Sequence, residues 1–138
     1  MPAALLAPVF IQVVLTFALL FMMGGARYGA VKGGRADAKE ISVNSDAYPE
    51  DVRIASNCFR NQFELPTLFY AVTAFALIAG AQSHLMTALA WAFALTRLLH
   101  AFVFVVTKNL NHRFLAYLAG AVILMVMWAL LAYKTLLV

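Results

Sequence analysis

A group of polar side chains recurs at helical spacing near the middle of the chain. Asn57, Arg60, Asn61 and Glu64 stand at positions i, i+3, i+4 and i+7, which places all four on one face of an α-helix. The planar guanidinium of an arginine can donate two parallel hydrogen bonds to a carboxylate. A glutamate can hold an ammonium group, and an asparagine can hold an amide. The spacing therefore predicts a helix face suited to a small anionic ligand that carries carboxylates.

Further polar pairs occur elsewhere in the chain. Arg97 and His100 stand at i and i+3, and Arg113 and Tyr117 stand at i and i+4, so each pair shares a helix face. Arg27 follows the first long apolar stretch. A thiol ligand held beside Arg113 would be kept as the thiolate, because a nearby cation stabilises the charged form. This is a route to conjugation or peroxide reduction without a nucleophile from the protein.

The composition indicates that these side chains belong to a membrane protein. Of the 138 residues, 64% are hydrophobic and 12% are charged, against about 45–50% and about 25% in soluble domains. We therefore expect a single membrane domain over residues 1–138. Ten basic residues and a net charge of +4 do not indicate a nucleic-acid-binding surface. The single cysteine, Cys58, excludes an intramolecular disulfide and a multi-cysteine metal site, and no metal is expected.

Four segments are apolar enough and long enough to cross a bilayer, which takes roughly 20 residues. The expected spans cover about residues 4–24, 57–80, 85–107 and 114–133. We expect the second helix to begin early, near residue 49, and to run about 48 Å to residue 80, and Pro66 can kink it. The expected fold is an all-α, integral membrane four-helix bundle.

The basic residues set the expected orientation. Most of them lie in the first loop, residues 27–56, or in the third loop, which holds Lys108 and Arg113. The positive-inside rule then places both loops in the cytoplasm and both termini outside. In this topology all four helices bring polar groups to one level just inside the cytoplasmic leaflet. The sequence therefore predicts a net positive pocket at that level, open to lipophilic molecules from the bilayer.

These residues also have structural interpretations, which the sequence leaves open. Arg27 and Arg113 could anchor helix ends at the membrane surface. Glu64 could form an ion pair with Arg60 or Arg97 that only joins helices, although ionisable groups inside a membrane are functional by default. His100 could be a packing residue.

The pattern resembles the MAPEG family, the membrane-associated proteins in eicosanoid and glutathione metabolism. The resemblance rests on four spans, a basic first loop, the runs Arg-Asn-Gln-Phe-Glu-Leu-Pro (60–66) and Thr-Arg-Leu-Leu-His (96–100), and Arg113 with Tyr117. It implies a homotrimer with glutathione bound between subunits near the cytoplasmic face. Arg113 matches the arginine that stabilises the glutathione thiolate. The positions implied at the glutathione site are Arg27, Arg60, Asn61, Glu64, Arg97, His100 and Tyr117.

Three positions depart from the family's glutathione-dependent synthases. Asn57 stands where they have an arginine, Phe104 replaces a tyrosine of the third helix, and Phe114 replaces a serine of the prostaglandin synthase. The run Asn-Gln-Phe-Glu-Leu-Pro is closer to a bacterial branch of the family. No eicosanoid substrate is implied.

Two functions follow as hypotheses. The first is a membrane glutathione transferase or peroxidase that acts on lipophilic electrophiles. The second is a non-catalytic membrane protein of the same fold that binds another anionic small molecule or a lipid headgroup. A small four-helix transporter is a third interpretation, but such proteins typically carry their key carboxylate in the first span, where this chain has no ionisable residue.

Overall fold

The computed structural model describes residues 2–137, and every regular element in this range is helical. The all-α expectation is therefore confirmed. The elements in chain order are α1 (Pro2–Lys32), α2 (Ala38–Ile41), η1 (Ser45–Ala47), α3 (Glu50–Arg60), η2 (Asn61–Phe63), α4 (Leu65–Ile78), α5 (His84–Phe102), η3 (Val103–Thr107) and α6 (Leu110–Leu136).

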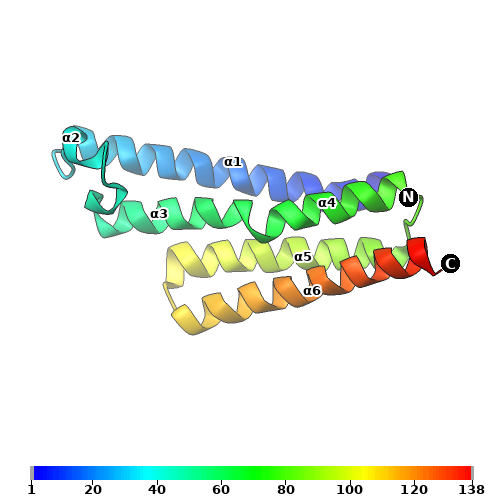
Figure 1. Cartoon of the computed structure of the whole chain (residues 1–138). Coiled ribbons are helices and arrows are strands. Elements are labelled where there is room, and N and C mark those ends of the chain that lie inside the picture. Colours follow the sequence, from blue (N-terminus) through cyan, green and yellow to red (C-terminus); the bar gives the residue numbers. More distant parts are fainter. Residues whose placement is uncertain (1, 138) are drawn as a thin grey trace.

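The long helices lie side by side in a bundle (Figure 1). α1 packs against α3, α4 and α5, and α6 packs against α4 and α5. The polar segment that carries α2 and η1 and the turn between α5 and α6 lie at one end, and the α4–α5 connection lies at the other (Figure 1). The two basic loops of the sequence therefore share one end of the bundle, which we call the basic end.

Three helical stretches in the described range are long and apolar enough to cross a bilayer. They are α1, α5 continued by η3 to Thr107, and α6. Together they make the chain a helical, multi-pass membrane protein. The remaining long rod is made of α3, η2 and α4, and it is not one of these three uninterrupted apolar helices.

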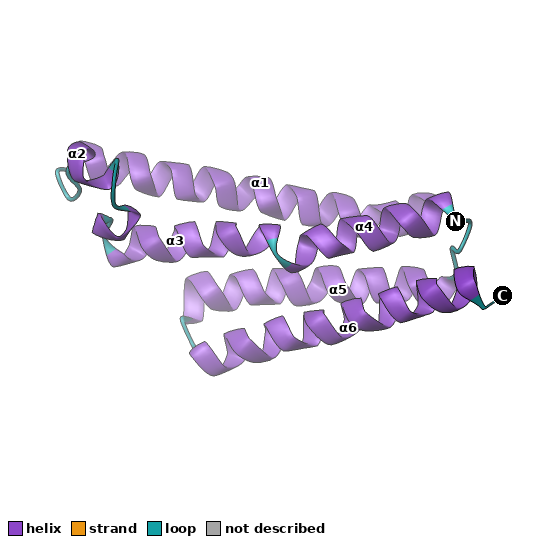
Figure 2. Cartoon of the chain, in the orientation of Figure 1, coloured by secondary structure: helices purple, strands orange, loops and turns teal. Residues whose placement is uncertain are grey.

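The expectation of one continuous helix from residue 49 to residue 80 is wrong, because the rod is interrupted between α3 and α4 (Figure 2). Glu64 has φ −93° and ψ −103°, outside the α-helical region. Pro66 stands in the first turn of α4, where its missing N–H costs least. α4 has 14 residues and is about 21 Å long, which is short for a hydrocarbon core of about 30 Å.

Local sequence accounts for the other helix boundaries. Gly80 has φ +65°, a left-handed conformation that glycine adopts without strain after a helix end. The Ser83 hydroxyl oxygen accepts a hydrogen bond from an N–H group in the first turn of α5, and the Asn109 side chain does the same at the start of α6. The π-helical turn η3 ends at Lys108, which has φ 54°.

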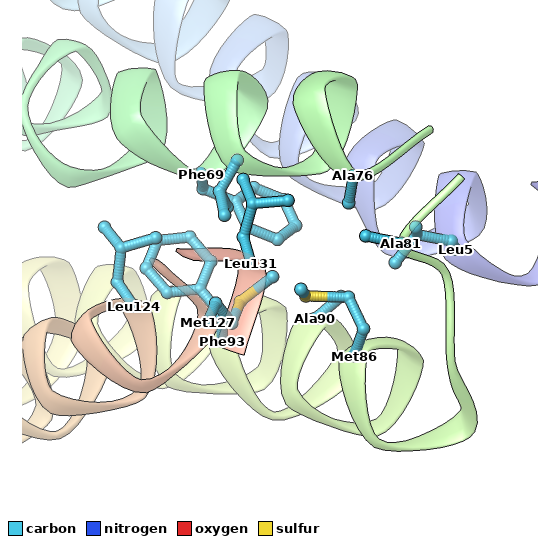
Figure 3. Packing of buried hydrophobic residues seen from close by; sticks show 11 residues of the cluster. Leu5, Phe69, Ala76, Ala81, Met86, Ala90, Phe93, Leu124, Met127 and Leu131 are labelled. Carbon is cyan, nitrogen blue, oxygen red and sulfur yellow. The ribbon is translucent and has the colours of Figure 1, made fainter. Parts of the chain in front are cut away.

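The apolar core is concentrated in the half of the bundle near the α4–α5 connection (Figure 3). There Phe69 and Phe93 stack with ring centroids 4.5 Å apart, among buried leucine, methionine and alanine side chains. The half near the basic end has a smaller apolar cluster of Leu19, Cys58, Ala101 and Phe104. Four of the buried polar residues border this smaller cluster and the break, namely Gln12, Gln62, Arg97 and His100, whereas Thr73 is buried within α4.

Candidate anion-binding site

A cavity of about 420 Å³ opens beside the break between α3 and α4, on the side of the bundle that faces α6. Its volume lies within the range of small-molecule sites, about 300–1,000 Å³. α3, η2, the break, α5, η3 and α6 each contribute to its wall. We call it the Arg113 cavity. Its lining residues are Asn57, Arg60, Asn61, Glu64, His100, Phe104, Leu110, Arg113, Phe114 and Tyr117.

Six of the eight predicted site residues meet in this cavity, namely Arg60, Asn61, Glu64, His100, Arg113 and Tyr117. The helical spacing was a correct guide to this convergence, although the positions do not lie on one regular helix. Arg60 ends α3, Asn61 begins the 3₁₀ turn η2, and Glu64 occupies the break. The break therefore positions the side chains that the sequence assigned to one helix face.

Glu64 is held by a hydrogen bond rather than by an ion pair. The Tyr117 hydroxyl donates to Glu64 Oε2 at 3.1 Å. Across residues 2–137 the one ion pair joins Arg35 and Asp51, and neither residue lines this cavity. The interpretation that Glu64 pairs with Arg60 or Arg97 to join helices is therefore wrong for this subunit. The cavity lining keeps two arginines against one carboxylate, which leaves a net positive charge.

Aromatic rings fix the position of Arg113. Its Cζ lies 4.4 Å from the centroid of the Phe104 ring, a distance suited to a cation–π contact. The His100 ring lies 5.7 Å from Phe104 and 5.9 Å from Tyr117, measured between centroids. Phe104 lacks the hydroxyl of the tyrosine expected from the resemblance, and its ring instead supports the guanidinium that faces the cavity.

Arg97 lies behind the wall of the cavity and does not line it. Its side chain is fully buried, and its Cζ is 5.9 Å from the Tyr117 ring centroid. Nη2 donates to the backbone carbonyl of Asn61 at 3.1 Å, while Nε and Nη1 have no hydrogen-bond partner within the described part of the chain. Arg97 therefore joins α5 to the break and does not line the cavity of one subunit, and its contact with a ligand stays a prediction.

Comparison with known protein families gives one match, in which the MAPEG family model aligns with residues 5–133. The chain belongs to the MAPEG family. The resemblance read from the sequence is thereby confirmed over nearly the whole chain. Searches of curated proteins and of solved structures gave no match.

In this MAPEG protein Arg27 lies apart from the other predicted site residues. Its Nε and Nη2 donate to Ser56 Oγ at 3.2 and 3.1 Å, and its Cζ lies 5.2 Å from the Tyr48 ring centroid. It lines a second cavity, of about 490 Å³, between α1 and α3. Asn57 and Arg60 line both cavities. One subunit therefore does not bring Arg27 into the Arg113 cavity.

Two glutamines in the MAPEG chain were missed by the sequence analysis. Gln12 Nε2 donates to Gln62 Oε1 at 2.8 Å, and Gln62 Nε2 donates to the Cys58 carbonyl at 3.0 Å. Both side chains are buried, so this pair links the middle of α1 to the break. The available signal was the amide of Gln12 within an otherwise apolar stretch that has no charge from Met1 to Ala26.

Proposed function

We propose that this MAPEG protein binds glutathione in the Arg113 cavity and acts as a glutathione transferase or peroxidase on lipophilic electrophiles. The observation that carries the proposal is the meeting of Arg60, Glu64 and Arg113 in one cavity with a net positive charge. Glutathione is a tripeptide with two carboxylates, one ammonium group, two amides and a thiol. Few small metabolites combine these groups.

The residues of the cavity fit those groups. Arg60 would take a carboxylate through two hydrogen bonds, and Glu64 would take the ammonium group. Asn57 and Asn61 would bind the amides. The buried and incompletely hydrogen-bonded guanidinium of Arg97 adds positive charge behind the wall, which favours an anion in front of it.

Arg113 would govern the chemistry. Bound glutathione would supply a nucleophilic thiolate. The Arg113 guanidinium, held by the Phe104 ring at 4.4 Å, would favour that thiolate roughly 10- to 1,000-fold, as a cation next to an acid does. Phe104, Leu110 and Phe114 give the same cavity an apolar wall, which would admit a lipophilic electrophile and limit the access of water.

We extend the proposal to assembly and orientation. Glu64 and Arg60 are exposed at the cavity in a single subunit, so a second subunit of a homotrimer would complete the wall. The basic end of the bundle would face the cytoplasm, as the positive-inside rule requires. Native mass spectrometry in detergent tests the trimer directly, and a monomer at working concentration contradicts it.

The test of the function is a comparison of binding and turnover in purified, detergent-solubilised protein. Calorimetry measures glutathione binding, ultraviolet absorption measures the bound thiolate, and a model electrophile measures turnover. We expect Arg113→Ala to lose the thiolate signal and turnover while it retains most of the binding. Lys134→Ala removes the same charge from the other end of α6 and should behave like the wild type. Normal turnover in Arg113→Ala would refute the role of Arg113.

A non-catalytic function is the second candidate, and the cavity lining gives it support. Asn57, Phe104 and Phe114 replace groups that the family's synthases use, and all three line the cavity. The ligand would then be another anionic small molecule or an anionic lipid headgroup. A thermal-shift panel separates the two candidates, because stabilisation by the other anion but not by glutathione would support the second.

A further inference from the structure

Three cavities follow the seam between α1 and the rod of α3, η2 and α4, which lie alongside each other (Figure 1). Neighbouring cavities among the three share lining residues. The first, of about 490 Å³, and the second, of about 250 Å³, share Arg27, Ser56 and Arg60. The second and the third, of about 320 Å³, share Phe59 and Phe63. We call the three together the α1 groove.

The polarity of the α1 groove changes along its length. The first cavity carries five charged side chains, which are Arg27, Asp46, Glu50, Arg53 and Arg60. The third cavity is lined almost wholly by apolar and aromatic groups, including Val13, Phe17, Leu20 and Tyr70. A groove that is charged at one end and apolar at the other matches an amphiphile, because each part of such a ligand meets a surface of its own kind.

The charges of the first cavity are arranged in order of depth. Arg27 and Arg60 also line the next, deeper cavity, whereas Asp46, Glu50 and Arg53 line only the outer one. None of these five forms an ion pair with another residue of the described range 2–137. From the apolar end outward, a ligand therefore meets hydrocarbon, then the guanidinium groups of Arg27 and Arg60, then the carboxylates of Asp46 and Glu50 together with Arg53.

We propose that the α1 groove binds a phospholipid of the surrounding bilayer that carries a phosphoethanolamine headgroup. One acyl chain would lie along Phe17, Leu20 and Phe63. The phosphate would contact Arg27 and Arg53, and the terminal ammonium group would reach Asp46 and Glu50.

The depth of the groove supports a lipid of the bilayer as the occupant. Arg27 is the first charged residue of the chain and follows an uncharged stretch from Met1 to Ala26, so it marks the boundary between hydrocarbon and headgroups. A basic pocket between helices at that boundary is a typical site for a lipid phosphate. The order of groups in the groove is also the order of acyl chain, phosphate and ammonium in such a lipid.

Native mass spectrometry of the full-length protein in detergent tests the proposal with defined lipids. The ligands are phosphatidylethanolamine, phosphatidylcholine, phosphatidylglycerol and glycerophosphoethanolamine, which is the headgroup without chains. We expect phosphatidylethanolamine to bind best and the chainless headgroup to bind at least tenfold more weakly. Equal retention of all four ligands would overturn the proposal.

Variants locate the binding to the two ends of the groove. Arg53→Ala should weaken phosphatidylethanolamine roughly tenfold, as the loss of a charge-assisted hydrogen bond does. Leu20→Trp, or Val13→Trp should the first not fold, should block the acyl chain and leave the headgroup affinity unchanged. Lys39→Ala, a basic residue of the same polar segment outside the groove, should bind like the wild type.

The outcomes separate this site from the Arg113 cavity. Arg53 does not line that cavity, so Arg53→Ala should retain glutathione binding, and Arg113→Ala should retain phosphatidylethanolamine. Wild-type lipid binding by both Arg53→Ala and Leu20→Trp would overturn the proposal. Cross-linking of a reactive group placed at Leu20 to a second copy of the chain would also overturn it, because a protein neighbour would then fill the groove.

Discussion

Replacement of Arg97 by methionine tests how a fully buried guanidinium is held in this bundle. A charged side chain at mid-membrane costs roughly 2.5–3.5 kcal/mol even on lenient scales. The hydrogen bond from Nη2 to the Asn61 carbonyl returns about 1.5–3 kcal/mol, typical of a bond from a charged donor. Methionine fills a similar volume without the charge. We therefore expect the free energy of unfolding of Arg97→Met to stay within about 2 kcal/mol of wild type, on the stabilising side.

A buried ion pair would give the opposite result, since loss of one partner costs about 3–5 kcal/mol. No carboxylate in the described chain lies within 4.0 Å of Arg97, so this large loss is not expected. Unfolding by a denaturing detergent, followed by circular dichroism, measures the difference. A loss of more than about 3 kcal/mol would show that Arg97 has a charged partner and would refute the reasoning.

Anion binding should respond differently to the same substitution. The Arg97 Cζ lies 5.9 Å from the centroid of the Tyr117 ring, and an anion in the cavity lies beyond that ring. At an effective dielectric constant of about 20, two charges 5.9 Å apart interact by about 3 kcal/mol. The anion lies farther from Arg97 than the ring, so this energy is an upper limit, and the affinity should fall by less than about 100-fold. Lys134→Met, at the far end of α6, controls for the loss of one charge. Unchanged glutathione affinity in Arg97→Met would show that its charge does not reach the cavity.

Three further predictions use other parts of the structure. A double-mutant cycle of Gln12→Leu and Gln62→Leu, read by detergent unfolding, should give a coupling energy of roughly 0.6–2 kcal/mol; no coupling would contradict the buried hydrogen bond. Although desolvation acts in the opposite direction, the hydrogen bond and charge of Arg35 hold the pKa of Asp51 below its usual 3.8. The contribution of this pair to stability is therefore complete above that pH and is lost as the pH falls through the lowered pKa. The melting temperatures of wild type and Asp51→Asn should accordingly converge in acid, and a constant difference would refute the link. A reporter enzyme fused to either terminus should be found outside the cytoplasm. A reporter found in the cytoplasm would reverse the proposed orientation.

The sequence was sufficient to predict the convergence of six of the eight site residues, because polar side chains in an apolar chain are few and their spacing assigns each to a helix face. It was less informative about depth. Arg97 and His100 share a face of α5, yet they stand about 4.5 Å apart along the axis. That distance puts His100 in the cavity wall and Arg97 behind Tyr117. Residue spacing gives the face of a helix on which a side chain lies. It does not show whether the side chain of a neighbouring helix covers that position.

The packing of α1 could not be predicted from the sequence, for a different reason. Its apolar residues show no clear stripe, so the direction of each face depends on what α3 and α5 present to it. Arg27 consequently lies at the seam with α3, bonded to Ser56, and not with the other predicted residues. Gln12 was overlooked because one neutral amide hardly alters the hydropathy of a long apolar segment. Its importance depends on Gln62, which is fifty residues away in sequence.

The break between α3 and α4 links these observations, because irregular backbone at membrane depth is tolerated only where it is buried in protein or lines a cavity. Here two side chains supply the hydrogen bonds that a continuous helix would have made. Arg97 donates to the carbonyl of Asn61, and Gln62 donates to that of Cys58. Since Gln62 is itself held by Gln12, both α1 and α5 brace the break from behind. The break places Glu64 in front, within reach of Tyr117, so the same local irregularity both requires the buried polar residues and creates the wall of the cavity.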